Sequence, residues 1–328
     1  MTPEETALSF RRALLSKDRE AIGRMAAAYA PVRQAILTRL SALQSRIAEA
    51  RESGETITPA WLMQEERYRE LLSAVSLETE RFARLLDADL RIRIRDSASQ
   101  GQEDALTYLR TFAGGTNAFD ALPIGAVENL VGATVNHAPL RAILADLAPA
   151  ASQQVTDALI EGIALGDSPR TIARTIRRVS GAPLQRSFLI ARTETLRAYR
   201  EASRETYQQN SDICRGWQWV CALSQRTCAA CLAMHGRVFP LNEPMGSHPA
   251  CRCVMICLLH DVPNPIEEGA GETWLRGQKA ETQAVILGER GAAAWRNGDV
   301  ELRDFIREKR SRAWGVTRSA RTPPLTKI

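Results

Sequence analysis

Side chains that bind metal ions are concentrated in one short segment of this chain, RTCAACLAMHGRVFP…SHPACRC, residues 226–253. It begins with a Cys-x-x-Cys step and ends with His-Pro-x-Cys-x-Cys. Two donor-bearing turns separated by a short stretch of chain are typical of a tetrahedral zinc site, which prefers thiolate sulfur and imidazole nitrogen. The sequence therefore predicts a zinc site whose candidate ligands are Cys228, Cys231, His248, Cys251 and Cys253.

The fourth ligand of this predicted site has two candidates. Cys251 and Cys253 are two residues apart, so on an extended chain they share a face and either thiol could reach the metal. Spacing does not decide between them, and we favour Cys253 by a narrow margin. Four sulfur and nitrogen ligands leave no open coordination position, so we expect the zinc to be structural.

Enzyme signatures are missing around the cluster. A zinc deaminase needs His-x-Glu and a proline before its first cysteine, where this chain has Thr227, and His-Glu-x-x-His is absent. His235 with Glu243 is the one weak candidate pair for a nuclease. Arg192 and Glu194 point to different faces of a predicted helix and cannot form a shared site. We therefore expect no enzymatic activity.

The cysteine count also favours metal binding over disulfides. Five of the seven cysteines lie within residues 228–257, and the N-terminus lacks a basic segment followed by an apolar one. The longest apolar run, Cys253–Leu259, is too short to cross a bilayer. We expect a protein made in a cytoplasm, without a membrane partner.

The net charge of +5 is carried almost wholly by arginine, which suits phosphate and carboxylate partners. Two stretches, 170–207 and 303–328, are distinctly basic. They could contact DNA or an acidic protein surface, and they could equally be solvated helix faces. The candidate contact residues are Arg170, Arg174, Arg177, Arg178, Arg310 and Arg312.

A long helical hairpin is expected at the N-terminus. Apolar residues recur at steps of three and four over 18–50 and again over 68–90, which predicts two amphipathic helices. Pro31 should kink or break the first helix. Residues 51–57 form the turn, and Thr58 with Pro59 begins the second helix.

Helices should also fill the middle of the chain. Residues 120–165 predict short helices broken at Pro123, Pro139 and Pro149. Ser168 is a good N-cap for a helix over 169–179, and a further helix covers about 184–209.

From Gly216 the period changes to that of strands. Trp217 and Trp219 alternate with Gln218, which predicts a strand with one apolar face; short strands at 236–240 and 253–259 complete a unit that a metal would stabilise. The tail should be helical at about 272–288 and 299–314. The fold class is mainly α with a small zinc-stapled β unit (α+β). The expected domains are a helical hairpin arm (1–113), a helical core (114–215), the β unit (216–262) and a basic helical tail (263–328).

Over roughly 160–305 the chain resembles the phage minor head protein family, also called head morphogenesis or Mu F-like proteins. The resemblance is carried by GIALGDSPRTIARTIRR (162–178), IARTETLRAYREASRETY (190–207), RTC-x-x-C with HGRVF, and HP-x-CRC (248–253). Carried over by the resemblance, the metal ligands are Cys228, Cys231, His248 and Cys253, with Cys251 left open.

The resemblance implies a low-copy capsid component in the virion, held inside the procapsid near the portal, that assists head assembly. Its implied partners are the portal protein, with scaffold, major capsid protein and non-specific DNA as further candidates. The hairpin lies outside the resembling segment, and we expect it to dock on portal or scaffold. Two alternatives stay open: a zinc-dependent nuclease or toxin-like enzyme, and a zinc-stapled non-specific DNA-binding protein.

Overall fold

The computed structural model describes residues 1–328 except 115–118, 124–125, 127–143, 166, 312–314 and 325–328. The described chain is mostly helical with two small antiparallel sheets, as the α+β expectation required. It divides into two compact units, each built from separate segments. Unit 1 holds 1–17, 93–134 and 192–328; unit 2 holds 18–92 and 135–191.

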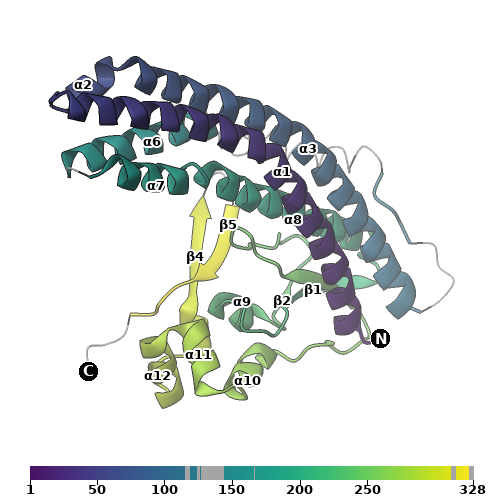
Figure 1. The fold of residues 1–328 in the computed structure, drawn as a ribbon. Coiled ribbons are helices and arrows are strands. Elements are labelled where there is room, and N and C mark those ends of the chain that lie inside the picture. The colour runs from purple at the N-terminus through teal and green to yellow at the C-terminus, as the bar shows by residue number, and fades with distance from the viewer. Residues whose placement is uncertain (115–118, 124–125, 127–143, 166, 312–314, 325–328) are drawn as a thin grey trace. The chain divides into compact units, whose positions relative to one another are not determined.

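The N-terminal helices are longer than the apolar pattern indicated. α1 (Pro3–Glu52) continues through Pro31 without the expected break, and α3 spans Glu66–Phe112 (Figure 1). Between them Thr58 caps the short helix α2 (Pro59–Gln64), accepting a hydrogen bond from Trp61 N as predicted. Both long helices run through both units.

Unit 2 has a core formed by residues of α1 and α3. Tyr29 of α1 meets Phe82 of α3 edge to face, with ring centroids 4.9 Å apart, and its hydroxyl donates to Ser180 O. α6 (Leu147–Ala164) and α7 (Pro169–Val179) lie side by side. The break expected at Pro149 is wrong, because Pro149 occupies the first turn of α6, where no backbone donor is needed. Pro139 lies outside the described residues.

Unit 1 is organised around a three-stranded antiparallel sheet of order β2–β1–β3. β1 is Cys214–Val220, β2 Val238–Phe239 and β3 Val254–Leu259, close to the predicted strands. Trp217 stacks on Phe239 across β1 and β2, with centroids 4.4 Å apart. The predicted apolar face is present, with Trp217 and Trp219 fully buried. The other face is buried as well: Gln218 is fully buried and donates to Gly236 O and Ile266 O.

The elements around this sheet come from distant parts of the chain. The first turns of α1, the end of α3 and the second half of α8 (Ala182–Gln209) contribute buried residues to one core with β1 and β3. α9 (Ala229–Met234) follows the first two cysteines. The tail adds α10 (Ala270–Arg276), α11 (Ala280–Leu287) and α12 (Glu289–Asn297).

The last part of the tail differs from the prediction of a helix at 299–314. A short 3-10 turn, η1 (Leu302–Phe305), leads into a hairpin of β4 (Ile306–Ser311) and β5 (Gly315–Ala320) (Figure 1). The predicted helix is wrong here, because Ile306 pairs with Ala320 and Arg310 with Val316 in a two-stranded ladder. A contact with the rest of unit 1 supports the strand conformation of this segment, because Arg318 N of β5 donates to Gly246 O.

Candidate metal centre

The five predicted donors meet at one place in unit 1. Cys228 is the N-cap of α9 and Cys231 lies in its first turn, so one helical turn presents both sulfurs. The His248 Nε2 atom lies 3.4 Å from Cys228 Sγ and 3.3 Å from Cys231 Sγ. Cys251 Sγ lies 3.7 Å from Cys231 Sγ. Cys253 completes a second triad with Cys231 and Cys251 whose sulfurs are all within 4.8 Å of one another.

These separations can be compared with those that a metal would impose. In a tetrahedral zinc site two sulfurs lie about 3.8 Å apart, and a sulfur and a nitrogen about 3.5 Å apart, given Zn–S of about 2.3 Å and Zn–N of about 2.0–2.1 Å. The observed 3.7 Å, 3.4 Å and 3.3 Å are close to these values. The donor set therefore fits a tetrahedral ion of this size.

The histidine is oriented for coordination through one nitrogen. His248 Nδ1 lies 2.9 Å from Pro249 O, and a carbonyl oxygen can only accept a hydrogen bond. Nδ1 therefore carries a proton, and Nε2 is the atom that faces the cysteines. A backbone carbonyl that fixes the ring in this way is the usual outer-shell partner of a metal-bound histidine.

Electrostatics at the cluster favour thiolates at Cys228 and Cys251, whereas the hydrogen bond to Cys228 raises the pKa of Cys231 well above its usual value and the pKa of Cys253 is raised as well. A hydrogen bond from Cys231 lowers the pKa of Cys228 to about 5, and one from Cys231 also lowers the pKa of Cys251 well below its usual value. Burial by itself lowers the pKa of His248, but its bonds to Cys228 and Cys251 outweigh this and raise the pKa to about 10. The site thus places negatively charged sulfurs beside the proton on His248 Nε2, and a metal ion bound there would displace that proton.

The loop that carries the last three donors is held by residues outside the motif. Arg200 of α8 is only 4% exposed; its Nε donates to Cys253 O (2.9 Å) and its Nη2 to Cys251 O (2.5 Å). Arg11 of α1 donates to the intervening carbonyl, Arg252 O, at 2.6 Å. Two guanidinium groups thus bind three successive carbonyls of the ligand loop.

The same loop contains a backbone conformation that needs support. Ala250 has φ +55°, in the left-handed region that a residue with a side chain adopts at a cost. Its N–H donates to Thr193 Oγ1 at 2.9 Å. Sequence reasoning missed Thr193, Arg200 and Arg11, because no local spacing connects them with the cysteines. Their only sequence signal is their place in the amphipathic helices.

The weak nuclease pair is engaged elsewhere. His235 is 1% exposed, accepts from Cys221 N through Nδ1 and has Nε2 3.6 Å from Glu4 Oε1; burial lowers its pKa to about 4. Glu243 pairs with Arg318 Nη2 at 2.8 Å. Both side chains therefore serve packing in unit 1.

The basic candidates whose side chains the structure describes are divided between the two units. Arg174, Arg177 and Arg178 are exposed on α7 in unit 2, whereas Arg310 is exposed on β4 in unit 1. Arg170 belongs to the first turn of α7, and Arg312 lies outside the described residues. The prediction of DNA or partner contacts at these arginines stays a prediction.

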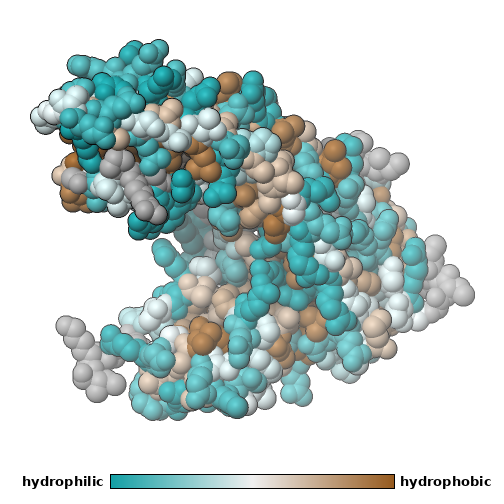
Figure 2. Space-filling model, in the orientation of Figure 1, coloured by the Kyte–Doolittle hydropathy of each residue, from teal (hydrophilic) through white to brown (hydrophobic). Residues whose placement is uncertain are grey.

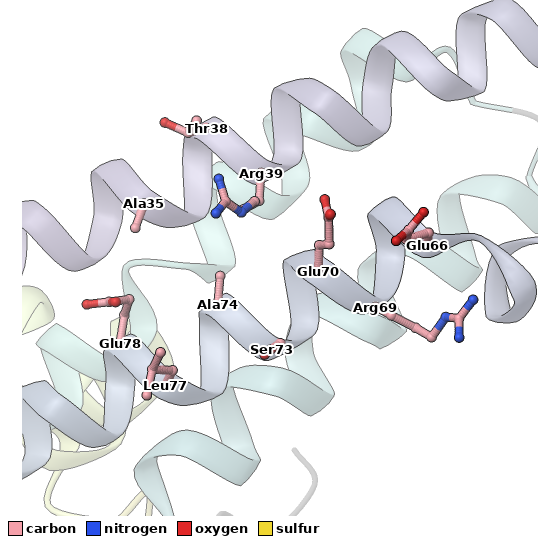
Figure 3. A pocket seen from close by; sticks show the side chains of 10 residues that line it. All are labelled: Ala35, Thr38, Arg39, Glu66, Arg69, Glu70, Ser73, Ala74, Leu77 and Glu78. Carbon is pink, nitrogen blue, oxygen red and sulfur yellow. The ribbon is translucent and has the colours of Figure 1, made fainter.

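Unit 2 also has an open groove between α1 and α3, of about 710 Å³. Figure 3 shows Arg39 and Glu70 directed into the space between the helices, with Ala35, Ala74 and Leu77 beside them. Its mixed charges and open form differ from the buried cysteine cluster. We treat it as a surface feature of unit 2.

The site thus belongs to a mostly helical α+β protein with a buried cysteine–histidine cluster. Residues 153–256 of this chain match the family described as phage Mu protein F like protein. This segment runs from α6 into β3 and contains all five donors. The match confirms the resemblance to this phage head morphogenesis family over that segment. No curated protein and no solved structure matches the chain. No described helix has the length and apolar composition needed to cross a bilayer.

Proposed function

We propose that this protein is a minor head protein that assists phage head assembly in low copy, inside the procapsid at the portal vertex. The family match over residues 153–256 carries the proposal. The metal centre would stabilise unit 1, because its three-stranded sheet is small. The ligands of the metal come from the segments before and after β2, so one ion would join these two segments. We assign it no catalytic role.

Zinc is the metal we propose, held by Cys228, Cys231, His248 and Cys251. Interactions with Cys228 and Cys251 raise the pKa of His248, and Cys251 Sγ lies 3.7 Å from Cys231 Sγ, which supports Cys251 over Cys253 as the fourth ligand. When bound, zinc would supply bonds that join α9 to the loop after β2. Elemental analysis of purified Cys251→Ser and Cys253→Ser proteins tests the assignment. We expect the first to lose zinc and the second to keep it; the reverse result would make Cys253 the ligand.

We place the docking surface for the portal on the part of the helical hairpin that belongs to unit 2, residues 18–92. Three large apolar side chains of α3 are exposed there: Leu77 by 45%, Leu85 by 61% and Ile92 by 62%. Their spacing of eight and seven residues places them along one stripe of the helix. On the side of the molecule drawn in Figure 2, apolar residues lie scattered among hydrophilic ones. Such a stripe supports packing against a partner helix.

Co-expression with the portal protein of the same phage tests the function. Size exclusion and native mass spectrometry should show a stable complex with a few copies per portal ring. A Leu85→Gln/Ile92→Gln variant should lose the complex and keep its zinc, with Val285→Gln as an exposed control. Deleting the whole hairpin is a poorer test, because Ala105, Tyr108 and Leu109 of α3 belong to the core of unit 1. A folded protein that never binds portal would contradict the proposal.

DNA is a second candidate partner, favoured by the exposed arginines of α7 and β4. Contacts of this kind neutralise phosphates, so binding would weaken steeply with added salt and show no sequence preference. Titration of Arg174→Gln/Arg177→Gln/Arg178→Gln protein against duplex DNA should give a shallower salt dependence than the wild type. An unchanged slope would remove α7 from the contact surface.

A further inference from the structure

Two cysteines outside the metal centre lie unusually close together. Cys214 begins β1 and Cys257 lies in β3, and their Sγ atoms are 2.7 Å apart. Non-bonded heavy atoms normally settle at about 3.5–4.0 Å, whereas a disulfide bond is about 2.05 Å long. Within the metal centre Cys231 and Cys251 are separated by 3.7 Å. The Cys214–Cys257 contact is thus closer to a bond than to ordinary packing.

The sheet itself produces this contact. Cys214 pairs with Leu259, so Cys257 is its diagonal neighbour on the same face of the antiparallel ladder. The register shifts between Cys214 and Gly216, where the extra residue Arg215 forms an irregularity. Both thiols are only 1% exposed. The pairing is therefore held by backbone register.

We propose that Cys214 and Cys257 are a disulfide-forming pair, oxidised by a small-molecule disulfide such as oxidised glutathione. One protein thiolate attacks a sulfur of that disulfide, forming a mixed disulfide and releasing one thiol. The second protein thiolate attacks the protein sulfur of the mixed disulfide and releases the second thiol. Two protein thiols are oxidised to one S–S bond, and one reagent disulfide is reduced to two thiols that take up the two protons.

Burial decides when this reaction occurs. It raises the pKa of the Cys257 thiol and keeps reagents out, so the folded sheet reacts slowly. We expect the bond to form while β1 and β3 assemble or open transiently. Once formed, it is shielded from reductants in the same way.

The bond would close a loop that contains every metal donor, since all five lie between residues 214 and 257. The ends of the metal-binding segment would then stay together even when the metal is lost. The cysteines also divide by role: those of the metal centre, the separate buried Cys221, and this pair.

Oxidation of the full-length protein in a glutathione redox buffer tests the proposal. After equilibration with zinc present, both in native buffer and during refolding from urea, free thiols are alkylated in denaturant and peptides are analysed by mass spectrometry. We expect a linked peptide pair containing Cys214 and Cys257, with the cysteines of the metal centre alkylated. Cys221→Ser should leave the link intact, and Cys214→Ser should abolish it.

Two results would overturn the proposal. One is complete alkylation of both cysteines after refolding in oxidising buffer, where burial no longer shields them. The other is a link from Cys257 to a cysteine other than Cys214 in the wild type. Neither result depends on portal binding, so the pair can fail while the head-protein function stands. A supporting readout is zinc rebinding after chelation, expected to be faster in the oxidised protein than in the reduced one.

Discussion

Arg200 ties the ligand loop to the helical part of unit 1, together with Arg11 and Thr193. Besides its two bonds to the carbonyls of Cys251 and Cys253, its Nη1 donates to Ser247 Oγ at 2.8 Å, one residue before His248. A planar guanidinium can make these contacts together, whereas a lysine ammonium cannot. The metal donors thus depend on a residue about fifty positions away in sequence.

Replacing Arg200 should weaken metal binding. Arg200→Met leaves two buried carbonyls without donors and frees the loop, and loss of such outer-shell support typically costs about 10–100-fold in affinity. The metal affinity of Arg200→Lys should lie between that of Arg200→Met and that of the wild type. Competition with a chromophoric chelator measures the effect, with Arg186→Met on the exposed part of α8 as control. Equal affinity in all three variants would show that the loop holds its form without Arg200.

Glu194 provides a pH-dependent prediction. It is 3% exposed, and burial raises its pKa from 4.5 to about 7, partly opposed by Arg197. Because the folded-state pKa lies above the unfolded one, the contribution of the protonated group to stability is complete below about pH 4.5. It is lost as pH rises through about 7.

Glu194→Gln should therefore be more stable than the wild type at pH 8, by up to about 3 kcal/mol, and the advantage should shrink toward pH 5. Urea unfolding at several pH values measures this difference. Glu289→Gln, at an exposed position of α12, should show no such trend. A constant difference across the pH range would mean that burial does not raise the pKa of Glu194 above its unfolded value.

At the scale of elements, the close approach of α3 and α8 in unit 1 depends on a glycine. A Cβ added to Gly101 of α3 would lie 2.2 Å from the carbonyl oxygen of Tyr199 in α8. Ser203 Oγ donates to Gly101 O at 3.0 Å, and Tyr199 donates to Asp104 at 2.7 Å. Backbone atoms cannot move aside as a flexible side chain can.

Gly101→Ala should accordingly destabilise unit 1 by about 3 kcal/mol, the upper part of the usual range for overpacking. Gly23→Ala in α1 is the matched control, since nothing lies within 4 Å of a Cβ there. It should stabilise its helix by about 0.5–1 kcal/mol. Urea denaturation followed by circular dichroism measures both. A stable Gly101→Ala protein would show that α3 and α8 can separate without loss of the fold.

The hairpin of β4 and β5 shows how an element can be decided by its surroundings. Arg318 pairs with Glu243 and Glu308, and its guanidinium lies 5.2 Å from the ring centroid of Phe239. Gly246, two residues before His248, contacts β5 directly. The tail thus closes over the loop that leads to the metal donors.

At the scale of the whole molecule, metal dependence should be confined to one unit. All five donors lie in unit 1, while the buried residues of α1 between Tyr29 and Ile47 belong to unit 2. Removing zinc should free the loop around His248 and leave those residues packed.

Hydrogen exchange with and without a chelator measures this. Protection should fall at 214–259 and stay unchanged at 29–47 and 68–90. Addition of excess zinc should restore it, which separates metal loss from irreversible damage. Loss of protection across both units would show that the molecule unfolds as one cooperative body.

The sequence by itself determined the features that depend on neighbouring residues. The caps at Thr58 and Ser168, the extent of α7 and the Cys-x-x-Cys turn follow from local hydrogen bonding and spacing. The family resemblance also rested on such local motifs, and the match over 153–256 agrees with it.

Only the tertiary structure decided the features made by residues far apart in the chain. It brought Cys251 Sγ to 3.7 Å from Cys231 Sγ, bound the ligand loop to Arg200 and Arg11, buried Gln218, and turned the charged tail into a hairpin. A repeating pattern reports which face of an element is apolar, but not which partner covers it. Side-chain donors that reach a distant backbone leave no periodic trace, because a single arginine on a helix looks the same whether it faces water or a carbonyl.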